Sequence, residues 1–135
     1  DSLHPPANID KMTRGIPLTD DDRAPWLAAI HARIVESYRL NQGLVAACSA
    51  LKQRYRTVLA DGVAITWVYL KGSEELLSAR LQQRKHHFFK VQMLASQSAD
   101  LEEPRDAIVI DITLAPDAAV RQIVSVLSLP QAKVS

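Results

Sequence analysis

Residues 65–81 read ITWVYLKGSEELLSARL, a short apolar run followed by a turn and a segment with helical character. The run Ile65–Leu70 is almost continuously apolar, which is typical of a parallel strand covered on both faces. Ser73 can then cap a helix that continues through Leu81. A buried strand that leads into a capped helix is the building unit of an α/β fold.

The same alternation extends in both directions along the chain. Two further buried strands are predicted at Leu44–Cys48 and Ile108–Ile112. Four further helices are expected: one capped by Thr19 and running through Trp26, Ile30, Ile34 and Tyr38 to a stop at Gly43, and others at Lys52 to Leu59, Val91 to Ser98 and Pro116 to Leu127. The pattern predicts a single α/β domain over residues 1–135, with a mostly parallel sheet.

Composition narrows the class of protein. The 135 residues are 47% hydrophobic and 23% charged, as expected for a globular domain. The net charge is only +1 and the basic residues are spread along the chain, which argues against a nucleic-acid partner. No apolar run approaches the roughly 20 residues that span a bilayer, so no membrane partner is expected. Cys48 is the single cysteine and has no disulfide partner, which predicts a cytoplasmic protein.

Three stretches carry candidate chemistry, and the first is residues 1–27. It begins Asp1-Ser2-Leu3-His4-Pro5 and continues through Asn8 to Met12 and Gly15 to Leu18. It ends with Asp20, Asp22, Arg23 and Pro25-Trp26-Leu27. Dense polar residues between backbone-restricting Pro and Gly are typical of a shaped binding loop. Taken alone, the residues equally suit a solvated loop and a helix N-terminus that favours acidic side chains.

The second stretch runs from Cys48 to Arg56, where a predicted strand passes into a helix. Ligands of open α/β sheets gather at such strand ends, and helix N-termini favour anions there. Lys52 and Arg56 are four residues apart and so share a helix face. A solvated basic face is the alternative interpretation of this pair. Cys48 is interpreted as a core residue rather than a nucleophile.

The third stretch, Arg84 to Lys90, contains five basic or imidazole side chains and is followed by Met93-Leu94 and Leu101-Glu102. It could be only a solvated turn. The adjacent His86 and His87 could suggest a metal, but no carboxylate or cysteine spacing supports a metal site.

Together these stretches resemble the gluconate kinase (gluconokinase) family of P-loop small-molecule kinases, which is similar to shikimate and nucleotide kinases. The resemblance extends from Asp1 to about Ile112 and implies a three-layer P-loop kinase fold. It also implies phosphorylation of D-gluconate to 6-phosphogluconate, with ATP and Mg2+ as cofactors. A homodimer stays an open alternative to a monomer.

The resemblance also implies residue roles. Asp1 matches the acidic residue that contacts the substrate hydroxyl and acts as its base. Sugar-acid contacts are expected from His4, Lys11, Arg23, Ser49, Lys52 and Arg56. A lid over ATP is expected at about 84–104, with contributions from Arg80, Arg84 and His87. Two departures bear on lid closure: His86 stands where the family commonly has Gly, and the stretch 104–108 is short.

The phosphate-binding pattern G-x-x-x-x-G-K-S/T does not occur in these 135 residues. In the family it precedes the residue that matches Asp1, within an opening βαβ unit. We therefore expect that Asp1 is not the biological start, that the first βαβ portion is lacking and that this chain alone is inactive. Loss of the first strand would leave a gap of ~9.6 Å in the sheet, between the strands at 44–48 and 65–70. The alternatives are a related kinase for shikimate or another polyol acid, and a non-catalytic remnant that binds a sugar acid or a partner.

Overall fold

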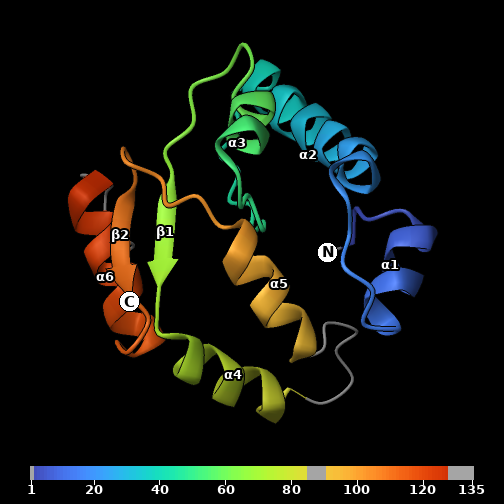
Figure 1. The fold of residues 1–135 in the computed structure, drawn as a ribbon. Helices are drawn as coiled ribbons and strands as arrows, with labels where there is room; N and C mark the ends of the chain where they lie inside the picture. The colour runs from blue at the N-terminus through green and yellow to red at the C-terminus, as the bar shows by residue number, and fades with distance from the viewer. Residues whose placement is uncertain (1, 85–90, 128–135) are drawn as a thin grey trace.

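The structure is a computed structural model that describes residues 2–84 and 91–127 (Figure 1). Within these residues the chain forms six helices and two strands. In chain order they are α1 (Pro6–Thr13), α2 (Asp20–Arg39), α3 (Gln53–Leu59), β1 (Val68–Lys71), α4 (Glu74–Gln83), α5 (Gln92–Asp100), β2 (Ile108–Asp111) and α6 (Pro116–Leu127).

The two strands form a parallel sheet, which confirms the predicted α/β class. The pairing starts at Val68 with Ile108 and ends at Lys71 with Asp111. The predicted strand at Ile65–Leu70 therefore begins three residues too early. Its first residues instead pack against the helices, because Ile65 and Trp67 contact the core between α2 and α3.

The strand predicted at Leu44–Cys48 is wrong, since this segment is irregular and Val45 is 99% exposed. A strand needs a hydrogen-bonded neighbour to form a ladder. In the described part of the chain, β1 pairs only with β2, and no strand lies beside segment 44–48. The apolar composition of this segment predicted a buried strand, but it could not show whether a neighbouring strand is present to pair with it.

The helices follow their predicted signals closely. Thr19 caps α2 in a reciprocal capping box with Asp22, and Ser73 accepts a hydrogen bond from the backbone of α4. The end of α2 differs in detail. Its last helical residue is Arg39, and the left-handed conformation that follows belongs to Asn41, with φ 52°, rather than to Gly43.

Helix α1 was not predicted, because residues 6–13 were interpreted as part of a binding loop. Pro6 at the start of the helix is compatible with its first turn. Met12 is buried in a small cluster with Leu18 and Met93, and this packing stabilises the short helix.

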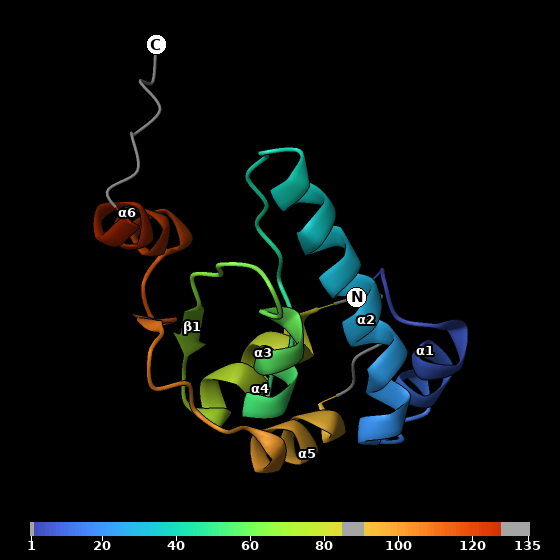
Figure 2. The same ribbon diagram turned by 90° about the horizontal axis from the view of Figure 1, so that it is seen from above.

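The main core lies between α2 and α3, where Trp26, Leu27, Ile30, Tyr55 and Leu59 are buried together. Helix α6 packs on β2, on the side of the sheet away from α1, while α2 and α3 pack on each other (Figures 1 and 2). The packing of α2 on α3 places the first turns of these two helices side by side.

Candidate functional site

Five polar side chains meet where α2 and α3 begin. They are Asp20 and Arg23 from α2 and Lys52, Arg54 and Tyr55 from the start of α3, and we call this set the α2–α3 corner. The two helices are brought together by the Trp26 and Leu59 core, so residues more than 30 positions apart become neighbours. The corner thus depends on tertiary packing rather than on local sequence.

Asp20 is at the centre of the corner. Its carboxylate accepts hydrogen bonds from the Tyr55 hydroxyl and from Lys52 Nζ, the latter at 3.2 Å, and it forms an ion pair with Arg54. The hydrogen bond from Tyr55, followed by that from Lys52, lowers the pKa of Asp20 below its ordinary value. The carboxylate is therefore ionised at neutral pH.

Tyr55 connects Asp20 to a second carboxylate through Arg23. Nη1 of Arg23 donates to the Tyr55 hydroxyl at 2.8 Å and to Oδ2 of Asp100 at 3.2 Å. Arg23 is only 4% exposed, so its charge needs these partners. The hydroxyl is consequently fixed from two sides, as an acceptor from Arg23 and a donor to Asp20.

Lys52 and Arg56 were predicted to act together, and the structure separates them. Lys52 is the N-cap residue of α3, is partly exposed and belongs to the corner. Arg56 is 5% exposed and donates to the carbonyl oxygens of Ala50, Leu51 and Glu102. These bonds hold α3 against segment 101–103, while a sugar-acid contact by Arg56 stays a prediction.

His4 lies in a different environment from the cations. Its ring stacks on Trp26 with centroids 4.4 Å apart and planes 8° apart, and Asn8 Nδ2 lies 3.3 Å from Nδ1. Burial, assisted by the positive charge of Arg23, lowers the pKa of His4 to about 4. The ring is therefore neutral near pH 7 and can offer a hydrogen bond but no charge.

Lys11 is paired within the protein. Its Nζ lies 2.9 Å from each carboxylate oxygen of Asp22. This interaction, together with the backbone amide of Thr19, lowers the pKa of Asp22 to about 2. A substrate contact by Lys11, which stays a prediction, would have to share the ammonium with Asp22.

The other predicted site residues are spread over the fold. Ser49 is exposed in the irregular segment before α3. Arg80 on α4 donates to the carbonyl of Ile112, and Arg84 is exposed at the end of α4. Asp1, His86 and His87 lie outside the described residues, as does much of the predicted lid at 84–104; α5 occupies its second half.

Sequence reasoning did not name Asp20, Arg54 or Asp100 among the candidate site residues. Asp20 was placed in the first polar stretch, with a helix-favouring acidic residue as the alternative, and nothing local relates it to Tyr55, 35 positions later. The interpretation of Cys48 as a core residue agrees with the structure, because Cys48 is partly buried against the core between α2 and α3. This burial raises the pKa of its thiol to about 11. A thiol with that pKa is a poor nucleophile at neutral pH.

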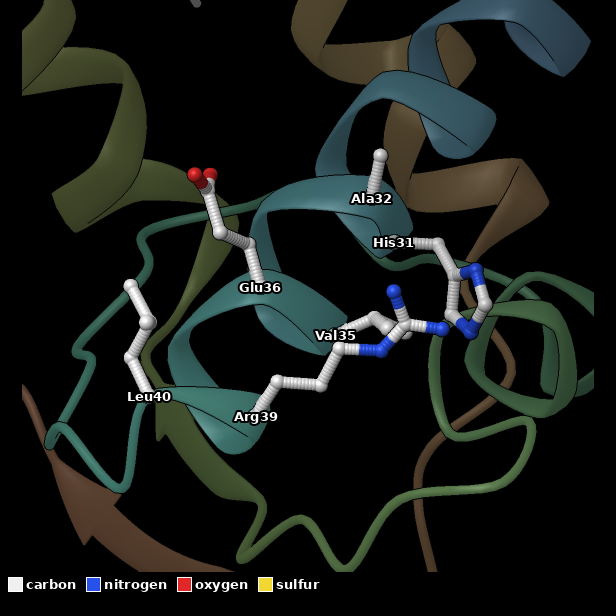
Figure 3. A pocket seen from close by; sticks show the side chains of 6 residues that line it. All are labelled: His31, Ala32, Val35, Glu36, Arg39 and Leu40. Atoms are coloured by element: carbon white, nitrogen blue, oxygen red, sulfur yellow. The ribbon is translucent and has the colours of Figure 1, made fainter.

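A surface hollow lies away from the corner. It has a volume of about 410 Å³ and follows the second half of α2, lined by His31, Ala32, Val35, Glu36, Arg39 and Leu40 (Figure 3). Its lining is mainly apolar, and His31 Nε2 donates to the carbonyl of Asp61. The hollow is thus at the opposite end of α2 from the corner and suits a sugar acid poorly.

The residues present do not fit the nucleotide half of a kinase site. Among residues 2–84 and 91–127, no group of three His, Cys, Asp or Glu side chains could hold a metal ion. The sequence also lacks the phosphate-binding loop pattern.

None of the helices within residues 2–84 and 91–127 is both long and apolar enough to cross a membrane.

No family model matches the sequence. Thermoresistant gluconokinase of Escherichia coli is 42% identical over 132 residues, which cover 94% of this chain and 75% of that protein. The chain belongs to the gluconokinase family. Gluconokinase of Gluconobacter oxydans is 49% identical over 107 residues, covering 78% of this chain and 60% of that protein.

Solved structures of a sugar kinase and of a gluconokinase share the fold. A sugar kinase from Janibacter sp. HTCC2649 matches with a TM-score of 0.87 and 36% identity, over 96% of this chain and 77% of its own. A gluconokinase from Sinorhizobium meliloti 1021 matches with a TM-score of 0.82 and 41% identity, over 95% and 74%. The chain therefore spans about three quarters of each solved kinase.

Proposed function

We propose that the protein takes part in ATP-dependent phosphorylation of D-gluconate to 6-phosphogluconate, and that the α2–α3 corner binds the sugar acid. The observation that carries the proposal is the charge of the corner. Arg23, Lys52 and Arg54 face two carboxylates, Asp20 and Asp100, so one positive charge is left uncompensated. One cationic charge beside exposed donors suits the single carboxylate of an aldonic acid. Membership of the gluconokinase family supports gluconate as that acid.

We assign the following roles to the residues of the proposed site. Lys52 holds the substrate carboxylate, while neutral His4 and the other predicted contacts orient the hydroxyls. Asp1 orients the attacking hydroxyl and accepts its proton. ATP and Mg2+ would supply and activate the phosphoryl group, but the residues present do not form their site. A segment carrying a phosphate-binding loop would be needed for turnover.

The activity is tested with the protein expressed from its whole reading frame. Coupled detection of ADP release should show gluconate-dependent turnover of roughly 1–100 s⁻¹. Residues 1–135 expressed alone should show none, because they contain no loop for the phosphates. Turnover with shikimate or another polyol acid but not gluconate would favour the related-kinase alternative. Gluconate binding without turnover of the whole protein would favour a non-catalytic binder.

Substitution of Lys52 separates binding from catalysis. In Lys52→Ala the KM for gluconate should rise about tenfold while kcat holds, because a carboxylate grip acts equally in ground and transition states. Lys71→Ala is the matched control, since Lys71 pairs with Glu103 on the exposed end of β1. An unchanged KM in Lys52→Ala would remove Lys52 from the site.

Substitution of Asp1 tests the proposed base. Asp1→Asn keeps the shape of the side chain but loses its basicity, so kcat should fall by about 10²–10⁴-fold with a smaller change in KM. Asp10→Asn is the control, because Asp10 is an exposed residue paired with Arg14. A kcat within a few-fold of wild type would dismiss the base and leave Asp1 a substrate contact.

A further inference from the structure

Asp20 and Asp21 are adjacent acidic residues in the first turn of α2, but only one of them is engaged by the corner. Asp21 is exposed, whereas Asp20 contacts Lys52, Arg54 and Tyr55. Either aspartate would favour the N-terminus of the helix. The helix terminus therefore explains an acidic residue at this end of α2, but it does not explain three partners converging on the same carboxylate.

The partners of Asp20 all come from the start of α3. Lys52 Nζ lies 3.2 and 3.5 Å from the two carboxylate oxygens and 5.8 Å from the centroid of the Tyr55 ring. The Arg54 guanidinium lies at the same 5.8 Å from that ring. Both cations are thus arranged around one fixed tyrosine, whose hydroxyl binds Asp20.

Asp20 orients Lys52 without using all of its hydrogen-bonding capacity. An ammonium carries three donors, and in the described part of the chain its hydrogen bonds go to the Asp20 carboxylate alone. The Lys52 side chain is 26% exposed. Donors therefore remain for a ligand that approaches from solvent. When Asp100, the partner of Arg23, is counted with the corner, one net positive charge remains while Asp20 is ionised.

We propose that Asp20 is a positioning residue, which holds Lys52 and Arg54 of α3 in place for the carboxylate of the sugar acid. The inference rests on the proposed function and deepens it. Without Asp20, two long side chains lose their common anchor, and their rotamer freedom must be lost when the substrate binds. A rival interpretation is that Asp20 competes with the substrate carboxylate for the same cations. The two interpretations predict opposite changes in affinity.

The experiment compares three variants of the protein expressed from its whole reading frame. Asp20→Asn removes the charge and keeps the shape, Asp20→Glu keeps the carboxylate, and Asp21→Asn removes the same charge from the same turn of α2. Gluconate KM and kcat are measured for each, and calorimetry measures gluconate binding without ATP. Circular dichroism establishes that each variant is folded.

We expect the gluconate KM and dissociation constant of Asp20→Asn to rise about tenfold, the worth of one charge-assisted hydrogen bond, with kcat within about threefold of wild type. Asp20→Glu should recover most of the affinity, and Asp21→Asn should match wild type. An unchanged or lower KM in Asp20→Asn overturns the inference, the latter in favour of competition. Equal losses of kcat in Asp20→Asn and Asp20→Glu also overturn it. Wild-type protein that neither binds nor phosphorylates gluconate overturns the proposed function itself, and the inference with it.

Discussion

The α2–α3 corner and the sheet are built on different principles. In and around the corner, polar groups are buried and hold each other by directional bonds: His4, Asn8, Arg23 and Arg56 are all buried there. The sheet instead exposes apolar side chains, with Leu70 58% and Val109 54% exposed, although Ile110 on β2 is 1% exposed. Geometry near the corner is therefore set by contacts within the chain. The two-stranded sheet leaves apolar side chains exposed on both faces, because Leu70 lies opposite Ile110 on one face and Val109 lies on the other.

This difference between the corner and the sheet predicts which substitutions should lower the stability of the protein most. A buried charged group cannot lose its partner without leaving an unsatisfied charge, which is costly. An exposed apolar side chain has little to lose when it is replaced. Substitutions of polar residues near the corner should thus destabilise the protein more than substitutions of the exposed apolar residues of the sheet, the reverse of the usual ranking.

The largest effect is expected at Arg23. Arg23→Met should lower the free energy of unfolding by about 2–4 kcal/mol, because Tyr55 and Asp100 lose the donor that links them. Arg33→Met on the same helix is the control. Arg33 is exposed and lies 3.7 Å from Glu36, so its loss should cost less than about 0.5 kcal/mol. Urea unfolding measures the free energy of unfolding of both variants. Equal losses in Arg23→Met and Arg33→Met would contradict the difference drawn between buried and exposed charges.

The second effect is a pH dependence that originates at His4. The unfolded ring takes up a proton near pH 6.5, but the folded ring does so only near pH 4. The unfolded state thus binds more protons between these values, and stability falls as the pH drops from 6.5 towards 4. After allowance for partial contact with solvent, the loss should be about 2 kcal/mol.

His4→Phe isolates this contribution, because phenylalanine can stack on Trp26 but does not titrate. Urea unfolding at pH 7 and pH 4.5 should show a smaller pH-dependent loss in the variant than in wild type. The range stops at pH 4.5 because Asp22, with its pKa of about 2, contributes stability that is lost below about pH 4. An identical pH-dependent loss in His4→Phe would show that other groups cause it.

The smallest effect is expected at Val45. In residues 1–135 expressed alone, Val45→Ser should change the free energy of unfolding by less than about 0.5 kcal/mol, because the side chain is already 99% exposed. Ile110→Val is the control at a buried position of the sheet, with an expected loss of about 0.5–1.5 kcal/mol. A large loss in Val45→Ser would mean that segment 44–48 is packed against something in solution, and would sharpen the account of the sheet.

Much of the fold could be predicted because its signals are local. Thr19 and Ser73 are caps that act on backbone amides three residues away, and the apolar run before Lys71 is visible by itself. The strand at 44–48 failed because a ladder depends on a distant partner. Helix α1 was missed because its Pro and Asn residues suit a loop equally well, while its stabilising contact with Met93 is remote in sequence.

The candidate site shows the same limit more strongly. Lys52 could be predicted from its place at a strand-to-helix junction and from the family resemblance. Its partner Asp20 could not, because the bond joins residues 32 positions apart and requires α2 and α3 to be packed first. Asp100, the partner of Arg23, is 77 positions away and follows the same rule. Cations could be predicted from the sequence, but their counter-ions required the structure.

Asp22 contributes both to the cap of α2 and to the contact between α1 and α2. Its carboxylate accepts hydrogen bonds from the Thr19 amide, as part of the cap, and from Lys11 on α1. Its backbone carbonyl accepts a hydrogen bond from Asn8 at 2.7 Å. Helix α1 therefore cannot detach without disturbing the cap of α2. In hydrogen exchange, the amides of α1 and of the first turn of α2 would open as one cooperative unit, although a glycine turn separates them along the chain. One residue thus couples the opening of an eight-residue helix to that of the first turn of the twenty-residue helix beside it.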